Sequence, residues 1–341
     1  MMEDLLAVYQ HPALTVMIDD SQRFLDSLTF QMDQSLGRRV FDDPARALAW
    51  LTDAYHSAGE SAGRARPFAV DYDEQRLSFE RRVVVLDIDQ IYRMVCDRQR
   101  FLLPAVLVVD YAMPAMTGVE FFQAVRALPC KKILFTGQAD DLTAINAFNH
   151  GLIDRFLKKG DADVLDLLDS TIASLRKAYF RDQSRTLADL LGRHSHQFLS
   201  DPAMTVLVEQ LCQRYGFVEH YLFPDPEGLL LLDLHGHPTL LVIETAAGMQ
   251  AHLEAARDHC APEALCSALA ERRLIPFFAD TGMYAPAIAH DWLAYCLPAQ
   301  HHQGQHDYYW ALFDLPPGFL PAPIYSYAEF LRDQADRPSP G

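Results

Sequence analysis

Three acidic residues stand directly after short apolar segments, where their charge can do chemistry. Asp19 and Asp20 follow the segment 13–18, and Asp110 follows the segment 106–109. Two adjacent like charges repel unless a cation neutralises them, and Mg²⁺ prefers hard oxygen ligands with open water positions. The acid pair therefore predicts a Mg²⁺ site. Asp110 has two interpretations, a reactive carboxylate or the N-cap of the next helix.

Two further predicted strands end in groups that complement these acids. The segment 132–135 is followed by Thr136, and the segment 155–157 is followed by Lys158 and Lys159. Short valine-rich segments are typical of strands buried on both faces of a parallel sheet, and α/β proteins place their chemistry at the carboxyl edge of such a sheet. We therefore expect an acid pair, a lone acid, a hydroxyl and an ammonium at one sheet edge.

The order of these residues, together with Met113, Pro114 and Gly118 after Asp110, resembles the receiver domain of two-component response regulators, a CheY-like fold. The resemblance covers about the first half of the chain. It implies that Asp110 accepts a phosphoryl group from a sensor histidine kinase or a phosphotransfer protein. The Mg²⁺ ligands that it implies are Asp19, Asp20, Asp110 and the carbonyl of Ala112.

The resemblance assigns the remaining groups to the phosphorylated state. Thr136 would bond a phosphoryl oxygen, Lys159 would pair with it, and Phe156 would turn inward on activation. In-line phosphoryl transfer needs neutralised equatorial oxygens, which a metal ion, an ammonium and a hydroxyl supply. Gly160 stands where receivers usually have proline, so we expect a looser loop there, and Lys158 is an alternative to Lys159.

The receiver is expected over residues 12–180, as a five-stranded parallel, doubly wound sheet of the flavodoxin-like kind. A receiver needs only a short connection between its second helix, near 44–51, and the strand before Asp110. Residues 52–104 therefore read as an insertion, for which we predict a β-arm and a helix.

Within the insertion, Asp87 and Asp89 end a β-branched segment that precedes an expected helix at 90–98. An apolar run ending in Asp-x-Asp is also found in haloacid dehalogenases, with the first Asp as nucleophile. We favour the alternative, a helix N-cap, because nothing later in the chain supplies the rest of such a site.

The second half of the chain begins with a long helix, predicted for residues 162–180 from apolar residues at helical spacing. Residues 181–192 continue the stripe as a helical linker. An output domain is expected over 193–331, followed by a disordered tail at 332–341. Its pattern predicts an α+β fold with a mainly antiparallel sheet. The expected elements are a helix at 201–215, strands at 217–223, 229–235, 239–244 and 308–315, and helices between 248 and 273.

The order of these output elements resembles the core of PD-(D/E)xK nucleases. Asp233 and Glu244 fall at corresponding places, but the triplet that starts at Glu244 lacks the lysine. We therefore expect no enzymatic activity, since a phosphodiesterase would need a metal ion at both acids. PAS-like folds share the run of hairpins and remain an alternative. The histidines at 235, 237, 301, 302 and 306 are interpreted as solvated loop residues.

Charge distinguishes the possible partners of the output domain. From Thr186 to the end there are seven arginines, no lysine and nineteen acidic residues, a formal charge of −12 out of −17 for the whole chain. Binding to duplex DNA replaces counterions with Lys and Arg side chains, so this composition disfavours it. We expect an output that binds a downstream protein or forms a homodimer. The alternative is DNA or nucleotide binding on a degenerate nuclease-like scaffold.

The remaining composition is that of a two-domain cytoplasmic protein. The start of the 341-residue chain has no basic segment, and no apolar stretch approaches eighteen residues, so we predict neither a signal peptide nor a membrane span. Six cysteines without Cys-x-x-Cys spacing are read as reduced thiols. In length and architecture the chain also resembles the response regulators of α-hydroxyketone quorum-sensing systems.

Overall fold

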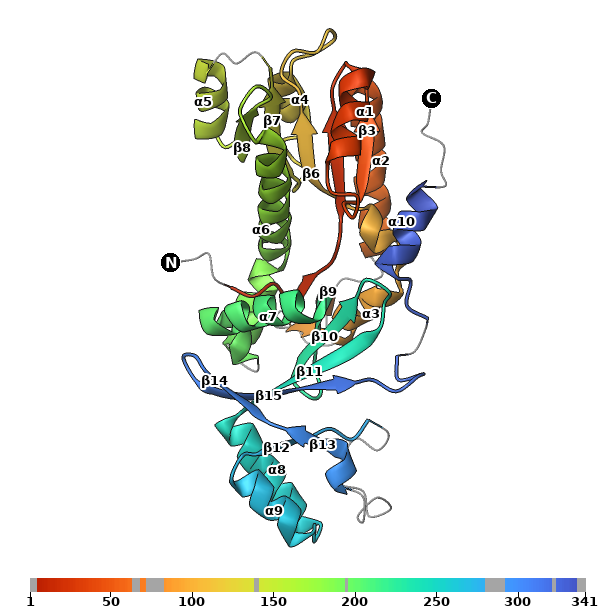
Figure 1. The fold of residues 1–341 in the computed structure, drawn as a ribbon. Coiled ribbons are helices and arrows are strands. Elements are labelled where there is room, and N and C mark those ends of the chain that lie inside the picture. Colours follow the sequence, from red (N-terminus) through yellow and green to blue (C-terminus); the bar gives the residue numbers. More distant parts are fainter. Residues whose placement is uncertain are drawn as a thin grey trace. The chain divides into compact units, whose positions relative to one another are not determined.

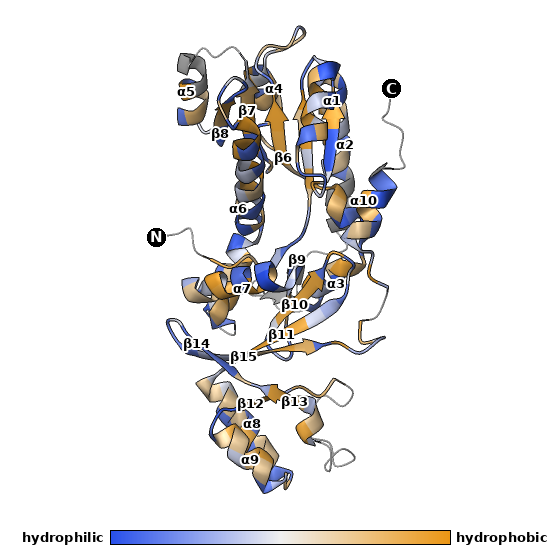
Figure 2. Ribbon diagram, viewed as in Figure 1, coloured by the Kyte–Doolittle hydropathy of each residue, from blue (hydrophilic) through white to orange (hydrophobic). Residues whose placement is uncertain are grey.

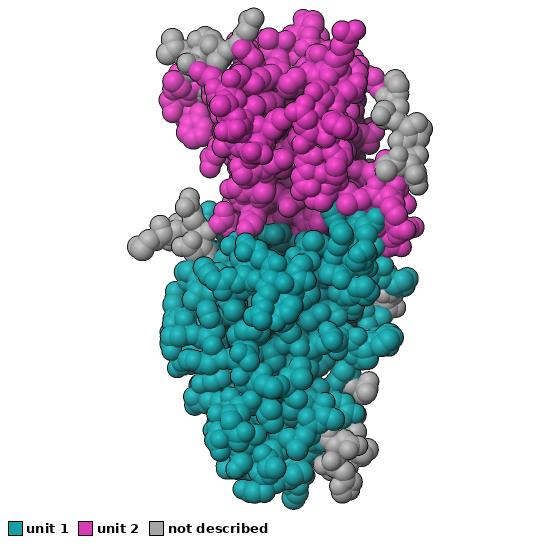
Figure 3. Space-filling model, in the orientation of Figure 1, with its two compact units in different colours: residues 1–10, 67–96, 184–328 teal, residues 11–66, 97–183, 329–341 magenta. Residues whose placement is uncertain are grey.

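The chain folds into two compact units, each built from three separate segments. The structure is a computed structural model, and it describes residues 5–62, 68–71, 83–137, 141–193, 196–279, 292–320 and 323–335. Unit 1 comprises residues 1–10, 67–96 and 184–328, and unit 2 comprises residues 11–66, 97–183 and 329–341 (Figure 3). The chain therefore passes between the units five times.

Unit 2 contains a parallel sheet of five strands in the order β3-β2-β6-β7-β8 (Figure 1). Its strands are β2 (Leu14–Ile18), β3 (Arg38–Phe41), β6 (Pro104–Val109), β7 (Lys131–Thr136) and β8 (Arg155–Lys158). Every residue of β2 and β6 is buried, as expected for strands covered on both faces. Figure 2 shows β6 and β7 in the orange of hydrophobic residues. The predicted flavodoxin-like receiver fold is confirmed.

Helices pack against both faces of this sheet. The helices that lie wholly in unit 2 are α1 (Gln22–Gln31), α2 (Pro44–Ala62), α4 (Gly118–Ala124) and α5 (Asp141–Asn149), with a short 3-10 helix at Arg98–Leu102. On one face, Leu51 of α2 and Phe121 of α4 join Val109 in a buried apolar cluster. Leu25 of α1 lies near Met17 and Val108, which point to the opposite face.

Two helices cross between the units. The helix α6 (Val164–Gly192) begins in unit 2 and ends in unit 1, and α10 (Tyr327–Ala335) begins in unit 1 and ends in unit 2. The long helix and its helical continuation were expected from the sequence, and α6 is one uninterrupted helix.

The tail predicted to be disordered from residue 332 is helical as far as Ala335. Within unit 2, the buried Phe330 packs on Phe101 with 5.4 Å between ring centroids, which anchors α10. The rest of the predicted tail, 336–341, lies outside the described residues.

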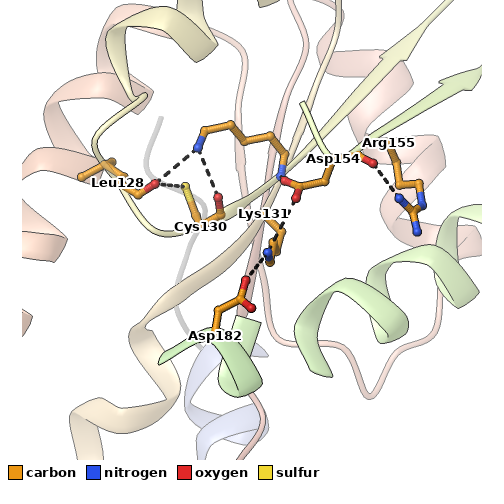
Figure 4. Close-up of polar contacts among 7 residues, drawn as sticks. Leu128, Cys130, Lys131, Asp154, Arg155 and Asp182 are labelled. Atoms are coloured by element: carbon orange, nitrogen blue, oxygen red, sulfur yellow. Dashed lines mark hydrogen bonds and ion pairs between the residues drawn. The ribbon is translucent and has the colours of Figure 1, made fainter. Parts of the chain in front are cut away.

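Polar contacts fix the amino edge of the receiver sheet, where β7 and β8 start (Figure 4). The Lys131 ammonium lies 2.5 Å from a carboxylate oxygen of Asp182 on α6 and 3.7 Å from Asp154. Asp154 also accepts a hydrogen bond from the backbone N–H of Lys132 at 2.7 Å. These contacts hold the two strands and α6 together at the edge opposite to the acidic residues.

Unit 1 is built around an antiparallel sheet in the order β1-β9-β10-β11-β15-β14. Its strands are β1 (Tyr9–Gln10), β9 (Phe217–Phe223), β10 (Gly228–Asp233), β11 (Pro238–Thr245), β14 (Gln300–Gln303) and β15 (Asp307–Asp314). The predicted strands correspond to β9, β10, β11 and β15. The short edge strands β1 and β14 were not predicted, because two to four residues carry too weak a pattern.

Helices and two small hairpins complete unit 1. The helices are α3 (Asp89–Arg93), α7 (Pro202–Tyr215), α8 (Ala246–Asp258) and α9 (Glu263–Ala270), with 3-10 helices at Met94–Cys96, Gln197–Ser200 and Trp292–Tyr295. The hairpins pair β4 (Phe68–Asp71) with β5 (Val83–Leu86), and β12 (Leu274–Pro276) with β13 (Cys296–Pro298). The described helices lack the combination of length and hydrophobicity that a membrane span requires.

The predicted insertion is divided between the units, and its described residues 68–71 and 83–96 belong to unit 1. Ile91 and Val95 are buried in the same apolar cluster as the strands β9 and β10, and the Tyr92 ring lies 4.9 Å from Phe223. Asp87 does not cap this helix as expected, since the N-cap position is Ile88. The Asp87 carboxylate instead accepts a hydrogen bond from the Gln90 side chain at 2.9 Å.

The two acids of the nuclease-like reading do not meet. Asp233 ends β10 beside the turn into β11, where Leu232 pairs with Pro238, whereas Glu244 stands near the far end of β11. Six residues of extended strand separate Glu244 from Pro238, a span of roughly 20 Å. A metal site shared by Asp233 and Glu244 is therefore incompatible with this register, which the sequence spacing alone did not reveal.

Candidate functional site

The ends of neighbouring parallel strands bring two acidic residues together. The backbone N–H of Asp110 donates to the carbonyl of Ile18 at 2.9 Å, so the β2–β6 ladder continues to the last residue of each strand. The N–H of Asp19 likewise donates to the carbonyl of Phe41 at the end of β3, at 3.2 Å. Both carboxylates consequently leave the sheet at its carboxyl edge.

One ammonium lies between these two carboxylates. The Lys159 Nζ is 2.5 Å from Asp19 Oδ2 and 2.6 Å from Asp110 Oδ1. Asp19 is 4% exposed and Asp110 is 7% exposed. Two buried carboxylates this close would repel without a cation between them, so Lys159 neutralises the pair.

Backbone amides orient the other oxygen of each carboxylate. The N–H of Ser21 donates to Asp19 Oδ1 at 2.9 Å, and the N–H of Ala112 donates to Asp110 Oδ2 at 2.7 Å. Each carboxylate is therefore held by a backbone donor on one oxygen and directs the other oxygen to the ammonium. Such double anchoring fixes the side chains before any ligand arrives.

Two aromatic rings guide the Lys159 side chain. Its Nζ lies 4.1 Å from the centre of the Phe24 ring, and Phe24 packs on Phe135 with 6.0 Å between centroids. The Lys159 N–H donates to the carbonyl of Thr136 at 2.9 Å, which fixes the start of the side chain. Phe24 was not identified from the sequence. Its only signal is an aromatic residue in the first turn after the acid pair.

The other predicted residues lie around this centre. Thr136 is buried at the end of β7, next to the central strand, and Phe156 is half-buried opposite Leu134 in the β7–β8 ladder. Lys158 pairs with Thr136 in the same ladder, and successive side chains of a strand point to opposite faces. The structure thus brings Lys159 to the two acids. Asp20 is exposed.

The start of α4 closes the site from the side of β6. A Cβ atom at Gly118 would lie 2.4 Å from the carbonyl oxygen of Asp110 and 3.0 Å from a methyl of Leu134, so only glycine fits. Thr117 and Glu120 form a capping box that fixes the first turn of the helix. The loop after Asp110 is therefore short and rigidly attached.

The donor set at this edge suits a hard divalent cation. Asp19 and Asp110 supply buried carboxylate oxygens that already converge on one positive charge. Across the described ranges, no three His, Cys, Asp or Glu side chains gather at metal-ligand spacing. Mg²⁺ commonly accepts one or two carboxylates and keeps several waters, so the residues present fit it.

Comparisons with known proteins find similar solved structures. No protein-family model matches the chain, and no curated protein matches it. The solved structure of the response regulator LqsR of Legionella pneumophila is 30% identical, with a TM-score of 0.78, and the match covers 96% of both chains. A CheY-like receiver domain protein of Methanospirillum hungatei is 16% identical over 48% of this chain and 94% of its own, with a TM-score of 0.30. The receiver domain of the Francisella response regulator 1452 is 15% identical over 49% and 98%, with a TM-score of 0.30.

Proposed function

The chain belongs to the family of the Legionella response regulator LqsR and carries the receiver domain of a response regulator, and we propose that Asp110 is its phosphoacceptor. The observation that supports this most is the Lys159 ammonium, 2.6 Å from Asp110 and 2.5 Å from Asp19. An acceptor carboxylate needs a nearby fixed cation, because the incoming phosphoryl group adds negative charge. A sensor histidine kinase or a phosphotransfer protein is the donor that this family implies.

Each neighbouring residue has a part in this proposal. Lys159 pairs with the phosphoryl oxygens, and the Thr136 hydroxyl bonds one of them. The N–H of Ala112 keeps the Asp110 carboxylate aimed along one direction. Asp19 and Asp110 hold Mg²⁺, with Asp20 and the Ala112 carbonyl as further ligands. When bound, this ion supplies charge neutralisation for the phosphoryl oxygens.

Labelling with a small phosphodonor tests the assignment of Asp110. The full-length protein incubated with Mg²⁺ and radiolabelled acetyl phosphate should acquire label, and Asp110→Asn should acquire none. Asp161→Asn is the matched control, since Asp161 is exposed in the loop after β8 and should label like the wild type. Equal labelling of Asp110→Asn and the wild type would reject the proposal.

The output that we propose is association, either with a downstream protein or between two copies of the chain. The acidic second half of the sequence is poorly suited to duplex DNA. The described part of the receiver also exposes large apolar side chains: Ile145 (53%) and Phe148 (51%) on α5, and Leu167 (46%) on α6. Such side chains are typical of interaction surfaces when they gather on one face.

The alternative output is DNA or nucleotide binding. The distance between Asp233 and Glu244 along the sheet argues against the metal site of an active phosphodiesterase, whereas DNA or nucleotide binding on a degenerate scaffold needs no such site. A mobility-shift experiment at physiological salt separates the two outputs. A role in quorum sensing, a cytoplasmic location and the lack of an enzymatic activity stay predictions.

A further inference from the structure

Unit 1 contains a cavity of about 930 Å³ that the proposed function does not use. It lies where the end of β11 passes into the first turn of α8, and the turn between β9 and β10 and the loop before β15 complete its wall. Small-molecule sites usually have volumes of about 300–1,000 Å³ and combine apolar walls with a few polar groups. The cavity has the size of a ligand site.

The charged groups on the wall are all acidic, apart from two histidines. The carboxylates are those of Asp225, Glu227, Glu244 and Asp307, and the lining residues include no lysine or arginine. The second half of the chain, with its formal charge of −12, adds to this negative potential. An anionic ligand such as a nucleotide is therefore disfavoured, and a cation is favoured.

Two of these carboxylates are built into the fold next to each other. The Ile243 N–H donates to the carbonyl of Glu227 at 2.9 Å, which holds the turn beside the end of β11. Glu244 lies over the first turn of α8, because a Cβ at Gly248 would come 1.9 Å from its Oε2. His252 Nε2 lies 3.0 Å from Glu244 Oε1. Burial and the nearby charge of Glu244 raise the pKa of Glu227 to about 7.

The rest of the wall decides what kind of cation fits. In the described part of the chain, no three His, Cys, Asp or Glu side chains gather as metal ligands. The wall also carries amide groups and apolar or aromatic surface. These residues are Gln197, Phe198, Pro226, Ile243, Gln303 and Tyr308. Carboxylates beside apolar and aromatic surface match an organic cation, whose nitrogens pair with the acids while its carbon atoms contact the apolar wall.

We propose that this cavity binds a small organic cation, an amine or a guanidine, with Glu227 and Glu244 pairing with its charged nitrogens. A charge-assisted hydrogen bond to each carboxylate compensates the repulsion between them. The binding site is separate from the Asp110 site, and the test below does not depend on phosphorylation.

Calorimetry with the full-length protein tests this inference, with spermidine and agmatine as probes and Mn²⁺ as the metal probe. We expect at least one organic cation to bind the wild type and Mn²⁺ not to bind in the cavity. Glu244→Gln should weaken binding at least tenfold. Glu254→Gln is the matched control, because Glu254 is exposed on the same helix α8 and does not line the cavity. It should bind like the wild type.

A pH series adds a second measurement that does not depend on Glu244→Gln being folded. Binding of a cation should release the proton of Glu227, so affinity should rise between pH 6 and pH 8, and Glu227→Gln should remove most of this rise. The other titratable groups that line the cavity with Glu227 are Asp225, Glu244, His252, His306, Asp307 and Tyr308. The histidines are present in both proteins, so the comparison of Glu227→Gln with the wild type isolates the contribution of the carboxyl group.

Three results would overturn the inference. In the first, neither organic cation binds the wild type. In the second, both organic cations bind Glu244→Gln and Glu227→Gln as tightly as they bind the wild type. In the third, only Mn²⁺ binds and the Glu244→Gln substitution abolishes that binding, which would make the cavity a metal site.

Discussion

At the scale of single residues, Lys159 determines whether Asp19 and Asp110 can stay charged side by side. Its ammonium forms ion pairs with both carboxylates, at 2.5 and 2.6 Å. Removing one partner of a buried ion pair leaves an uncompensated charge and costs about 3–5 kcal/mol. Here two carboxylates would be left facing each other.

We predict that Lys159→Met lowers the free energy of unfolding of the receiver by about 3 kcal/mol, because methionine keeps the length of the side chain and loses its charge. Urea denaturation measures the change. Adding Asp110→Asn to Lys159→Met should restore most of the loss, since a single carboxylate then remains. Losses that simply add in the double variant would show that the two groups do not interact.

The pKa of Glu227 predicts how the stability of unit 1 depends on pH. Because its pKa in the folded protein, about 7, is above the value near 4.5 of an ordinary glutamate, the folded state binds more protons than the unfolded state between these values. The stability contribution of Glu227 is therefore fully present at pH 4.5 and below, and it is lost as the pH rises to 7.

Glu227→Gln should abolish this loss. Relative to the wild type, we expect the variant to gain about 1–2 kcal/mol between pH 5 and pH 8, a value reduced for solvent screening of a half-buried carboxylate. Thermal unfolding across this pH range measures it, and Glu254→Gln serves again as the control. If Glu227→Gln loses as much stability between pH 5 and pH 8 as the wild type does, the raised pKa is contradicted.

At the scale of elements, the junction of β6 and α4 holds the loop after Asp110 in place. Gly118 is the first residue of α4. A Cβ atom added to Gly118 would lie 2.4 Å from the carbonyl oxygen of Asp110. Because that oxygen belongs to the backbone, a side chain at position 118 could be accommodated only by moving the end of β6.

Gly118→Ala should therefore destabilise the receiver by about 1–3 kcal/mol, the usual cost of overpacking, and should also slow phosphorylation of Asp110. Gly160→Ala is the matched control, because an added Cβ there meets no atom within 4 Å. Denaturation and acetyl phosphate labelling are the two measurements. If Gly118→Ala is as stable and as reactive as Gly160→Ala, the close approach is not a constraint.

At the scale of the whole molecule, phosphorylation should change the association state. The face carrying α5, β8 and α6 includes Phe156, and its exposed apolar side chains offer a surface for a partner. The negative charge of a phosphoryl group on Asp110 changes the association state only if the altered face binds a partner more tightly than the unmodified face does.

We predict a rise in mass on phosphorylation, seen by light scattering of the protein alone or with its partner, and Phe148→Glu should abolish it. Phe30→Glu is the matched control, since Phe30 is 84% exposed on α1, which is not one of the elements of that face, and has the same residue type. Phe156→Ala should reduce the rise. Identical masses of both forms, with and without partner, would exclude this output.

Local patterns explain how much of this molecule was predictable. Asp19, Asp110 and Lys159 each follow a short apolar strand, and parallel strands bring their ends to one edge, so their proximity was expected. The Phe24 contact depends on how α1 is rotated over the sheet, and no local pattern encodes that rotation.

Long-range pairing explains what was missed. Tyr9 and Gln10 pair with Tyr221 and His220, more than 200 residues later, and a two-residue strand has no detectable period. The insertion was assigned to the receiver domain because it lies within the receiver sequence. In the structure, its residues Ile91 and Val95 pack in the apolar cluster of unit 1. The separation of Asp233 from Glu244 required the β10–β11 register.

The pairing of β1 with β9 also sets an order of events during synthesis. The last strand of the receiver sheet ends at Lys158, whereas β9 starts at Phe217. Val8 is fully buried in the finished protein, and its carbonyl accepts a hydrogen bond from Leu222. From Lys158 to Leu222 the ribosome adds 64 residues (222 − 158), which takes roughly 3–13 seconds at about 5–20 residues per second. Until then the nascent chain carries the unpaired strand β1 and the apolar residue Val8 before it, although the sheet of the receiver is already complete. The risk of aggregation during translation is therefore greatest between the completion of the receiver sheet and the synthesis of β9.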